Sequence, residues 1–143
     1  MKVKKLLDSF NYAIEGIIYS VRTQRNMRIH MTVALLVLII CFFYDLSRAE
    51  ILAVIITISM VIMAELFNTA VEFAIDTTTN YYHPLAKISK NVAAGAVLIT
   101  AINAIAVGFI VFGDKLEYIN FIVIKKVRST SPYTIFIILM VVC

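Results

Sequence analysis

Four polar side chains recur at the spacing of one helix face in a stretch, residues 51–76, whose first half is almost wholly apolar. At about 100° per residue the four fall within an arc of about 80°. They are Glu65, Asn68, Glu72 and Asp76. An ionisable residue at membrane depth is costly, so it normally faces a protein interior or a wet cavity and marks a site. The alternative is a helix whose last turns are polar because they leave the membrane, and it stays open above all for Asp76.

Carboxylates on one helix face suit the chemistry of phosphate groups and a divalent cation. Mg²⁺ is normally held by one or two carboxylates together with substrate phosphate oxygens. Glu65, the deepest in the apolar segment, suits a general base for a lipid hydroxyl, because desolvation makes a carboxylate a better proton acceptor. Glu72 lies closer to water and is the better metal ligand, while Lys90 and Lys87 are placed to meet phosphate. The chain has no glycine-rich loop, so a nucleotide site must be built from helix faces.

The composition indicates an all-α membrane protein. Of 143 residues, 62% are hydrophobic and only 15% are charged, which is too apolar for a soluble domain of this length. The two cysteines, Cys41 and Cys143, have neither metal-ligand spacing nor a disulfide framework. No nucleic-acid partner and no signal peptide are expected.

The hydrophobic pattern predicts a surface helix followed by three membrane spans. Residues 1–28 are expected to form a basic amphipathic helix in the membrane interface. The first span must begin inside the polar block 23–30, because the apolar run after it is short. The second span follows Ser47 as N-cap, and the third covers roughly residues 92–112, in a helix whose first turn holds Pro84. Small residues four apart in the third span predict close helix packing, namely Ala96, Thr100, Ala104 and Gly108.

The distribution of lysine and arginine predicts the orientation. Residues 1–30 and the loop 77–91 are rich in basic side chains, so both are expected in the cytoplasm, with the turn 45–50 outside. Three polar zones then meet at the cytoplasmic surface. The zones are Gln24–Arg28, Glu65–Asp76 and His83–Asn91.

The end of the chain is set apart from this plan. We expect one membrane domain over residues 1–113 and a tail over residues 114–143. The tail ends in an apolar run, residues 132–143, that is shorter than the roughly 20 residues of a span. This run is interpreted as the start of a truncated fourth span.

The stretch ELFNTAVEFAID, residues 65–76, resembles the signature of the bacterial diacylglycerol kinase family. The likeness continues through residues 82–87 (YHPLAK) and residues 90–98 (KNVAAGAVL). Upstream, residues 25–30 (RNMRIH) are similar to the Gram-positive branch, which includes undecaprenol kinases. In all, the resemblance covers about residues 5–112 and is highly specific.

The resemblance implies an ATP- and Mg²⁺-dependent lipid kinase that works as a homotrimer, with active sites shared between subunits at the cytoplasmic face. It implies that Glu65 is the catalytic base and that Glu65 and Asn68 contact the lipid hydroxyl. Metal would be held by Glu72 and Gln24. The positions that match the family's ATP contacts are Lys5, Tyr12, Gln24, Glu72, Tyr82, His83, Lys90 and Asn91.

Three positions depart from the family's pattern. Gln24 stands where the family usually has a metal-binding glutamate, and Asn91 stands where it usually has an aspartate. Tyr81 stands where an acidic residue commonly precedes the Tyr-His pair. Glutamine and asparagine keep a carbonyl oxygen but lose its negative charge, so the affinity for Mg²⁺ should fall.

Three hypotheses therefore stand side by side. The first is a kinase for diacylglycerol or undecaprenol, between which the sequence does not choose. The second is a catalytically impaired family member that acts as a trimeric scaffold for lipid or nucleotide. Some members of the family continue into a membrane phosphatase domain, and the apolar run at the end of this chain is consistent with such a fusion. The third, a proton-coupled transporter that uses Glu65, is disfavoured because the polar residues gather at one surface.

Overall fold

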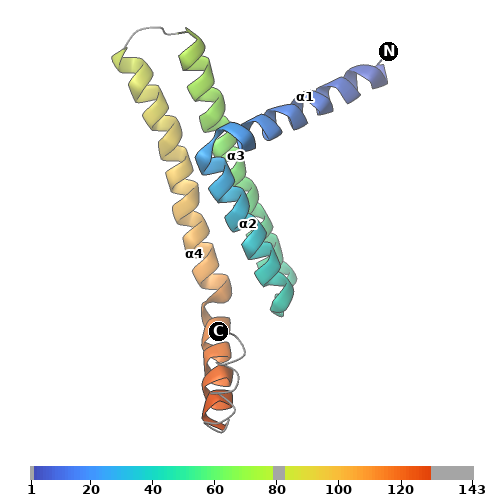
Figure 1. Ribbon diagram of the computed structural model, residues 1–143, viewed down its shortest axis with the longest axis vertical. Coiled ribbons are helices and arrows are strands. Elements are labelled where there is room, and N and C mark those ends of the chain that lie inside the picture. The colour runs from blue at the N-terminus through green and yellow to red at the C-terminus, as the bar shows by residue number, and fades with distance from the viewer. Residues whose placement is uncertain (1, 79–82, 130–143) are drawn as a thin grey trace, which may run out of the picture. The chain divides into compact units, whose positions relative to one another are not determined.

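The computed structural model is all-helical and describes residues 2–78 and 83–129, with side chains for residues 5–78 and 83–115. In these ranges the helices are α1 (Lys2–Thr23), α2 (Arg25–Phe43), α3 (Arg48–Thr78) and α4 (Pro84–Ser129) (Figure 1). The chain divides into two compact units, Met1–Val107 and Gly108–Cys143, and each is considered by itself.

Three helices are long and apolar enough to cross a membrane, as predicted. They are Arg25–Phe43, Arg48–Thr78 and Pro84–Lys115, with mean hydropathies of 2.0, 2.2 and 2.3. The first begins in the polar block, and the helix of the third begins at Pro84, as the sequence indicated. Because α4 continues to Ser129, the predicted boundary after residue 113 falls inside a helix. The apolar run 132–143 lies outside the described residues.

A break at Gln24 separates α1 from α2. The backbone there is extended, with φ −94° and ψ 123°. Arg28 Nη1 donates a hydrogen bond of 3.0 Å to the carbonyl oxygen of Arg22, and Thr23 Oγ1 donates one of 2.8 Å to that of Tyr19. The last four carbonyls of a helix lack intrahelical partners, and Arg28 satisfies one of them, whereas Thr23 bonds back to a carbonyl one turn earlier.

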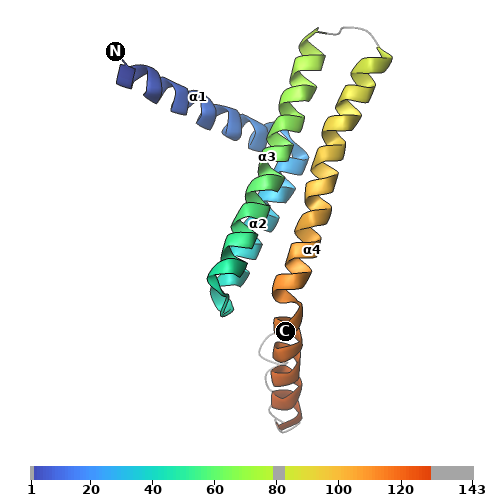
Figure 2. The same ribbon diagram turned by 180° about the vertical axis from the view of Figure 1, so that it is seen from behind.

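A short turn makes α2 and α3 an antiparallel hairpin. The two helices run side by side in both ribbon views (Figures 1 and 2). Ser47 Oγ accepts a hydrogen bond of 3.3 Å from the amide of Glu50, and Glu50 Oε2 accepts one of 2.7 Å from the amide of Ser47. This reciprocal pair is a capping box, which confirms Ser47 as the N-cap.

The core of the first unit is small and lies where α2, α3 and the end of α1 meet. Met27 of α2 is fully buried, and ring centroids of Tyr19 and Phe73 lie 5.4 Å apart, edge to face. Every buried residue of α3 lies on one side of that helix: Val54, Thr57, Val61, Glu65, Asn68 and Thr69. The packing face of α3 therefore continues into its polar face.

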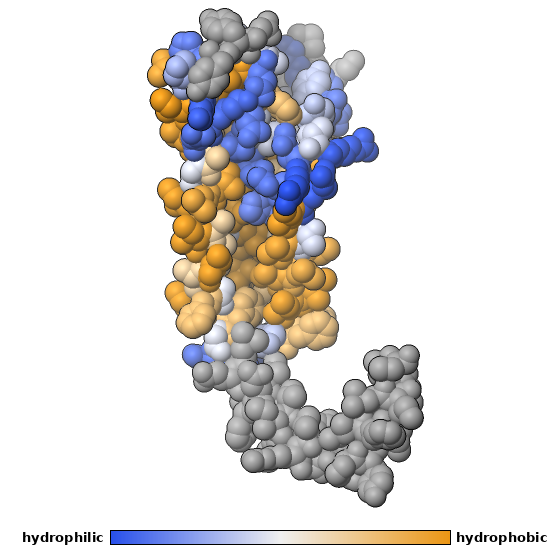
Figure 3. All heavy atoms as spheres, turned by 60° about the vertical axis from the view of Figure 1, so that its left-hand side comes forward, coloured by the Kyte–Doolittle hydropathy of each residue, from blue (hydrophilic) through white to orange (hydrophobic). Residues whose placement is uncertain are grey.

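Hydrophilic and hydrophobic residues separate along the first unit. On the face seen in Figure 3, hydrophilic side chains gather towards one end, and a broad hydrophobic band lies below them. Large apolar side chains of α1 stay exposed, including Leu6, Leu7, Phe10 and Ile14. The rest of the described chain does not cover them.

Candidate active site

Glu65 is the most buried charged residue among the described side chains. Only 2% of its surface is exposed, and Oε2 has no hydrogen-bond partner in the described part of the chain. Thr69 Oγ1, the neighbouring hydroxyl, donates a hydrogen bond of 2.9 Å to the backbone carbonyl oxygen of Glu65 and not to its carboxylate. A buried polar atom without a partner is costly, and such atoms cluster at functional sites.

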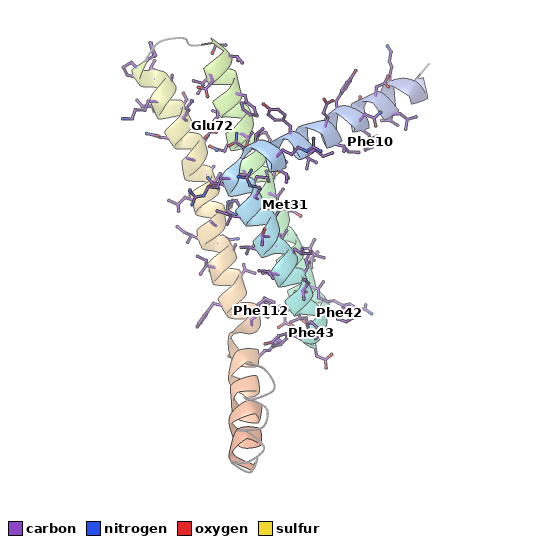
Figure 4. All side chains as sticks on the ribbon, in the orientation of Figure 1. Phe10, Met31, Phe42, Phe43, Glu72 and Phe112 are labelled. Atoms are coloured by element: carbon purple, nitrogen blue, oxygen red, sulfur yellow. The ribbon has the colours of Figure 1, made fainter. Side chains whose placement is uncertain are left out.

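Asn68 lies between Glu65 and Glu72 on the same helix face and is bonded to Glu72. Asn68 is 6% exposed, and its Nδ2 donates a hydrogen bond of 3.1 Å to Glu72 Oε1. Its own Oδ1 is buried without a partner among the described residues. Glu72 is only half-buried and lies towards the upper end of α3, whereas Phe42 and Phe43 mark the other end of the hairpin (Figure 4).

An ion pair joins the end of α3 to the beginning of α4. Lys90 Nζ meets Asp76 Oδ1, with 35% of the Lys90 side chain and 60% of the Asp76 side chain exposed. Lys87, one turn earlier, is exposed. Both interpretations of Asp76 left open above are thus partly met, because it is exposed but has a specific cationic partner.

His83 caps α4, and Asn91 is exposed on it. His83 Nδ1 accepts a hydrogen bond of 3.2 Å from the amide of Leu85, and its carbonyl oxygen accepts one of 3.2 Å from Lys87. Tyr82 and Tyr81 lie outside the described residues. These contacts place His83 and Lys90 on one helix near the polar end of α3.

The predicted site residues before the first span differ in their placement. Gln24 is half-buried, and the contact between Tyr19 and Phe73 brings its segment beside the turn of α3 that carries Glu72. Lys5 is exposed, and Tyr12 is 72% exposed. Figure 1 shows that α1, which carries both residues, leads away from the α2–α3 hairpin.

A groove of about 630 Å³ lies between α3 and α4. Its walls are mostly apolar, and on the α3 side Asn68 is the polar residue that reaches it. Ala96 and Thr100, two of the small residues predicted to pack closely, line the α4 side. Glu65 is not among the lining residues, whereas Asn68, three residues further along the same face of α3, reaches the groove.

His30 of α2 is a half-buried polar residue that the sequence did not single out. Its spacing of three from the fully buried Met27 was a usable signal, since residues three apart share a helix face.

The residues present fit a magnesium ion that is completed by phosphate. In the described ranges no group of three or more histidine, cysteine, aspartate or glutamate side chains could hold a metal by itself. Glu72 offers a half-buried carboxylate and the adjoining segment offers the amide oxygen of Gln24, all oxygen donors of the kind Mg²⁺ takes. One or two protein ligands are the normal number for Mg²⁺ bound with a nucleotide.

Comparison with known proteins agrees with this geometry. The family model described as "Prokaryotic diacylglycerol kinase" matches residues 11–112. The undecaprenol kinase of Bacillus subtilis (strain 168) is 37% identical over 115 residues, which cover 80% of this chain and 94% of that protein. A diacylglycerol kinase of Synechocystis sp. is 43% identical over 104 residues (72% of this chain, 59% of that protein), and one of Pseudomonas aeruginosa is 26% identical over 94 residues (66% and 76%). The chain belongs to the prokaryotic diacylglycerol kinase family.

Proposed function

We propose that this membrane protein transfers the γ-phosphate of ATP to the hydroxyl of a membrane lipid, either diacylglycerol or undecaprenol. The observation that carries the proposal is Glu65, a carboxylate that is 2% exposed and has an oxygen without a partner in the described chain. The names of the relatives, a diacylglycerol kinase and an undecaprenol kinase, support both lipid classes.

Glu65 is the proposed general base. The lipid hydroxyl enters beside Asn68, donates to Glu65 Oε2, and passes its proton there as its oxygen attacks the γ-phosphorus. The bond between the γ-phosphorus and the bridging oxygen breaks, and ADP leaves. Asn68 holds Glu72 by a hydrogen bond of 3.1 Å, which keeps the phosphate end of the site in register with the base.

Glu72 and Gln24 are the proposed holders of Mg²⁺, which supplies neutralisation of the phosphate charge. Lys90 contacts ATP phosphate by exchanging its ion pair with Asp76 for one with the nucleotide. The remaining proposed ATP contacts follow from the resemblance alone and are Lys5, Tyr12, Tyr82, His83 and Asn91.

The proposed assembly is a homotrimer whose sites lie at the cytoplasmic face. Lys5 and Tyr12 are exposed on α1, which leads away from the α2–α3 hairpin (Figure 1), and this supports a site completed by a neighbouring chain. The exposed apolar side chains of α1 suit a helix lying in the membrane interface.

The second candidate is a family member with impaired catalysis that binds lipid or nucleotide. Gln24 and Asn91 favour this candidate, because each lacks the negative charge of the family's acidic residue, which would help to neutralise Mg²⁺.

Transfer of radiolabel from γ-labelled ATP to each lipid in bicelles distinguishes the active kinase from the impaired family member. Wild type is compared with Glu65→Gln and with the double variant Gln24→Glu, Asn91→Asp. We expect transfer by wild type that disappears in Glu65→Gln. Activity only in the double variant would favour the impaired scaffold, and silence from both would reject the kinase.

A further inference from the structure

The ion pair of Asp76 with Lys90 lies just beyond one end of the groove between α3 and α4. On α4, the lining residues Ser89 and Val92 stand on either side of Lys90 in the sequence. On α3, Val71 is the last residue that lines the groove, and Asp76 follows it by five residues, a rise of about 7.5 Å. The pair therefore stands where the groove meets the polar end of α3.

The pair is also close to the proposed phosphate site. Glu72, the proposed metal ligand, lies one turn before Asp76 on the same face of α3. A phosphate group held at Glu72 therefore comes near the ammonium group that Asp76 holds.

Both members of the pair are open to exchange with a solute. The Lys90 side chain is 35% exposed and the Asp76 side chain 60% exposed, so a phosphate can approach either. Water and salt weaken an ion pair at such a surface. A nucleotide phosphate carries more negative charge than one carboxylate and offers several oxygens to an ammonium group. Phosphate can therefore replace Asp76 as the partner of Lys90.

We propose that Asp76 is a positioning residue that competes with the phosphates of ATP for Lys90 and so lowers the affinity for nucleotide. Without ATP, Asp76 holds the Lys90 ammonium group at the edge of the site. When ATP binds, Lys90 turns to a phosphate oxygen, and as ADP leaves, Asp76 takes Lys90 back. This role rests on the proposed contact of Lys90 with ATP.

The sign of the effect separates competition from structural support. If Asp76 competes, its loss leaves Lys90 without that partner, and the Kd for ATP falls by about two- to fivefold, the range that an exposed ion pair can contribute. Loss of a residue that only maintains the structure weakens binding instead.

The first experiment measures ATP binding directly by titration calorimetry in detergent, with Mg²⁺ present and no acceptor lipid. The parent chain carries Glu65→Gln, which removes the proposed base and prevents turnover. We expect Asp76→Asn to lower the Kd by about two- to fivefold. Asp45→Asn is the matched control, because it removes an exposed aspartate at the other end of the α2–α3 hairpin, and it should leave the Kd unchanged.

A double-mutant cycle then tests whether the effect passes through Lys90. In the background of Lys90→Gln, which should bind ATP more weakly, Asp76→Asn should leave the Kd unchanged because no ammonium group remains to compete for. In the background of Lys87→Gln, an exposed lysine one turn earlier on α4, it should still lower the Kd.

Four results would overturn the role of Asp76. The first is a Kd that is unchanged or raised in Asp76→Asn, and the second is an equal gain in Asp45→Asn. The third is a gain that persists in Lys90→Gln, as general repulsion of ATP would produce, or that is lost in Lys87→Gln. The fourth is no ATP binding by either the parent or Asp76→Asn. If the expected cycle is found but wild type phosphorylates no lipid, the proposed function fails and the role of Asp76 stands.

Discussion

At the scale of residues, Glu65 and Glu72 share one face of α3 but differ in their exposure to solvent. Glu65 is 2% exposed, whereas Glu72 is half-buried and accepts a hydrogen bond from Asn68. A carboxylate out of water suits proton transfer, whereas one at the edge of water can exchange ligands with a metal and phosphate. The proposed roles of Glu65 as base and Glu72 as metal ligand thus correspond to their different depths along α3.

Replacing Asn68 by leucine tests that connection. The side chain keeps its volume but loses the donor to Glu72 and the contact in the groove. Because a hydrogen bond to a charged group contributes about 1.5–3 kcal/mol, we expect lipid phosphorylation to fall by roughly 10- to 100-fold. Initial rates at saturating ATP measure this.

Ser59→Ala is the control for Asn68→Leu, because the Ser59 hydroxyl donates only to Ile55 of its own helix in the described chain. A wild-type rate in Asn68→Leu would remove Asn68 from the site.

At the scale of elements, α3 and α4 meet through a groove instead of a packed interface. Small side chains, among them Ala93 and Ala96, line the groove on the α4 side. An apolar groove that ends at a polar side chain is the form expected of a lipid site.

Ala96→Leu fills part of the groove. We expect a rise of about tenfold in the KM for lipid with little change in the KM for ATP. The added atoms would occupy the groove, where the acyl chain is proposed to lie, and not the polar end of the site. Ala94→Leu is the matched control, since Ala94 is exposed and does not line the groove. Equal effects of the two leucines would argue that the groove is not the lipid path.

The capping box at the start of α3 makes a different prediction, for stability alone. Ser47→Ala removes an N-cap, which costs about 1 kcal/mol and should lower the thermal midpoint by about 2–4 °C, with turnover unchanged. Circular dichroism in detergent follows unfolding, and Ser47→Asp should restore the midpoint. A loss of turnover would connect this end of α3 to the site.

At the scale of the whole molecule, one chain buries little of its apolar surface. Val97 is the buried apolar residue of α4 within the first unit, whereas Leu98, Ile99, Ile102 and Ile105 are at least 58% exposed. Lipid can cover part of this surface, but Lys5 and Tyr12 also need a partner surface if they are to meet ATP.

The proposed trimer predicts three chains per particle in sedimentation velocity in density-matched detergent. It also predicts that active-site variants complement each other. Inactive Glu65→Gln mixed with inactive Tyr12→Ala should regain turnover, because some sites then draw both intact residues from different chains. A monomeric particle, or mixtures as inactive as each variant alone, would contradict shared sites.

The sequence predicted those features that depend on a single helix. The face of Glu65, Asn68 and Glu72 follows from spacings of three and four, and the starts at Arg25, Ser47 and Pro84 follow from local polarity and capping. Features that need two helices escaped prediction. The partial burial of His30 depends on how α2 rotates against α3, and the ion pair of Lys90 with Asp76 depends on how the chain turns back after α3.

The length of α3 has a consequence for the membrane itself. Its 31 residues rise about 46 Å, whereas the hydrocarbon core is about 30 Å thick. Glu65 lies roughly 26 Å from the Arg48 end of the helix, and Glu72 lies about 10 Å further. If the core begins at Arg48, Glu65 lies inside the hydrocarbon core and Glu72 lies beyond its edge, in the headgroup region. A thicker bilayer would submerge Glu72, and a thinner one would leave Glu65 wet. The acyl-chain length of the surrounding lipids therefore becomes a component of the site.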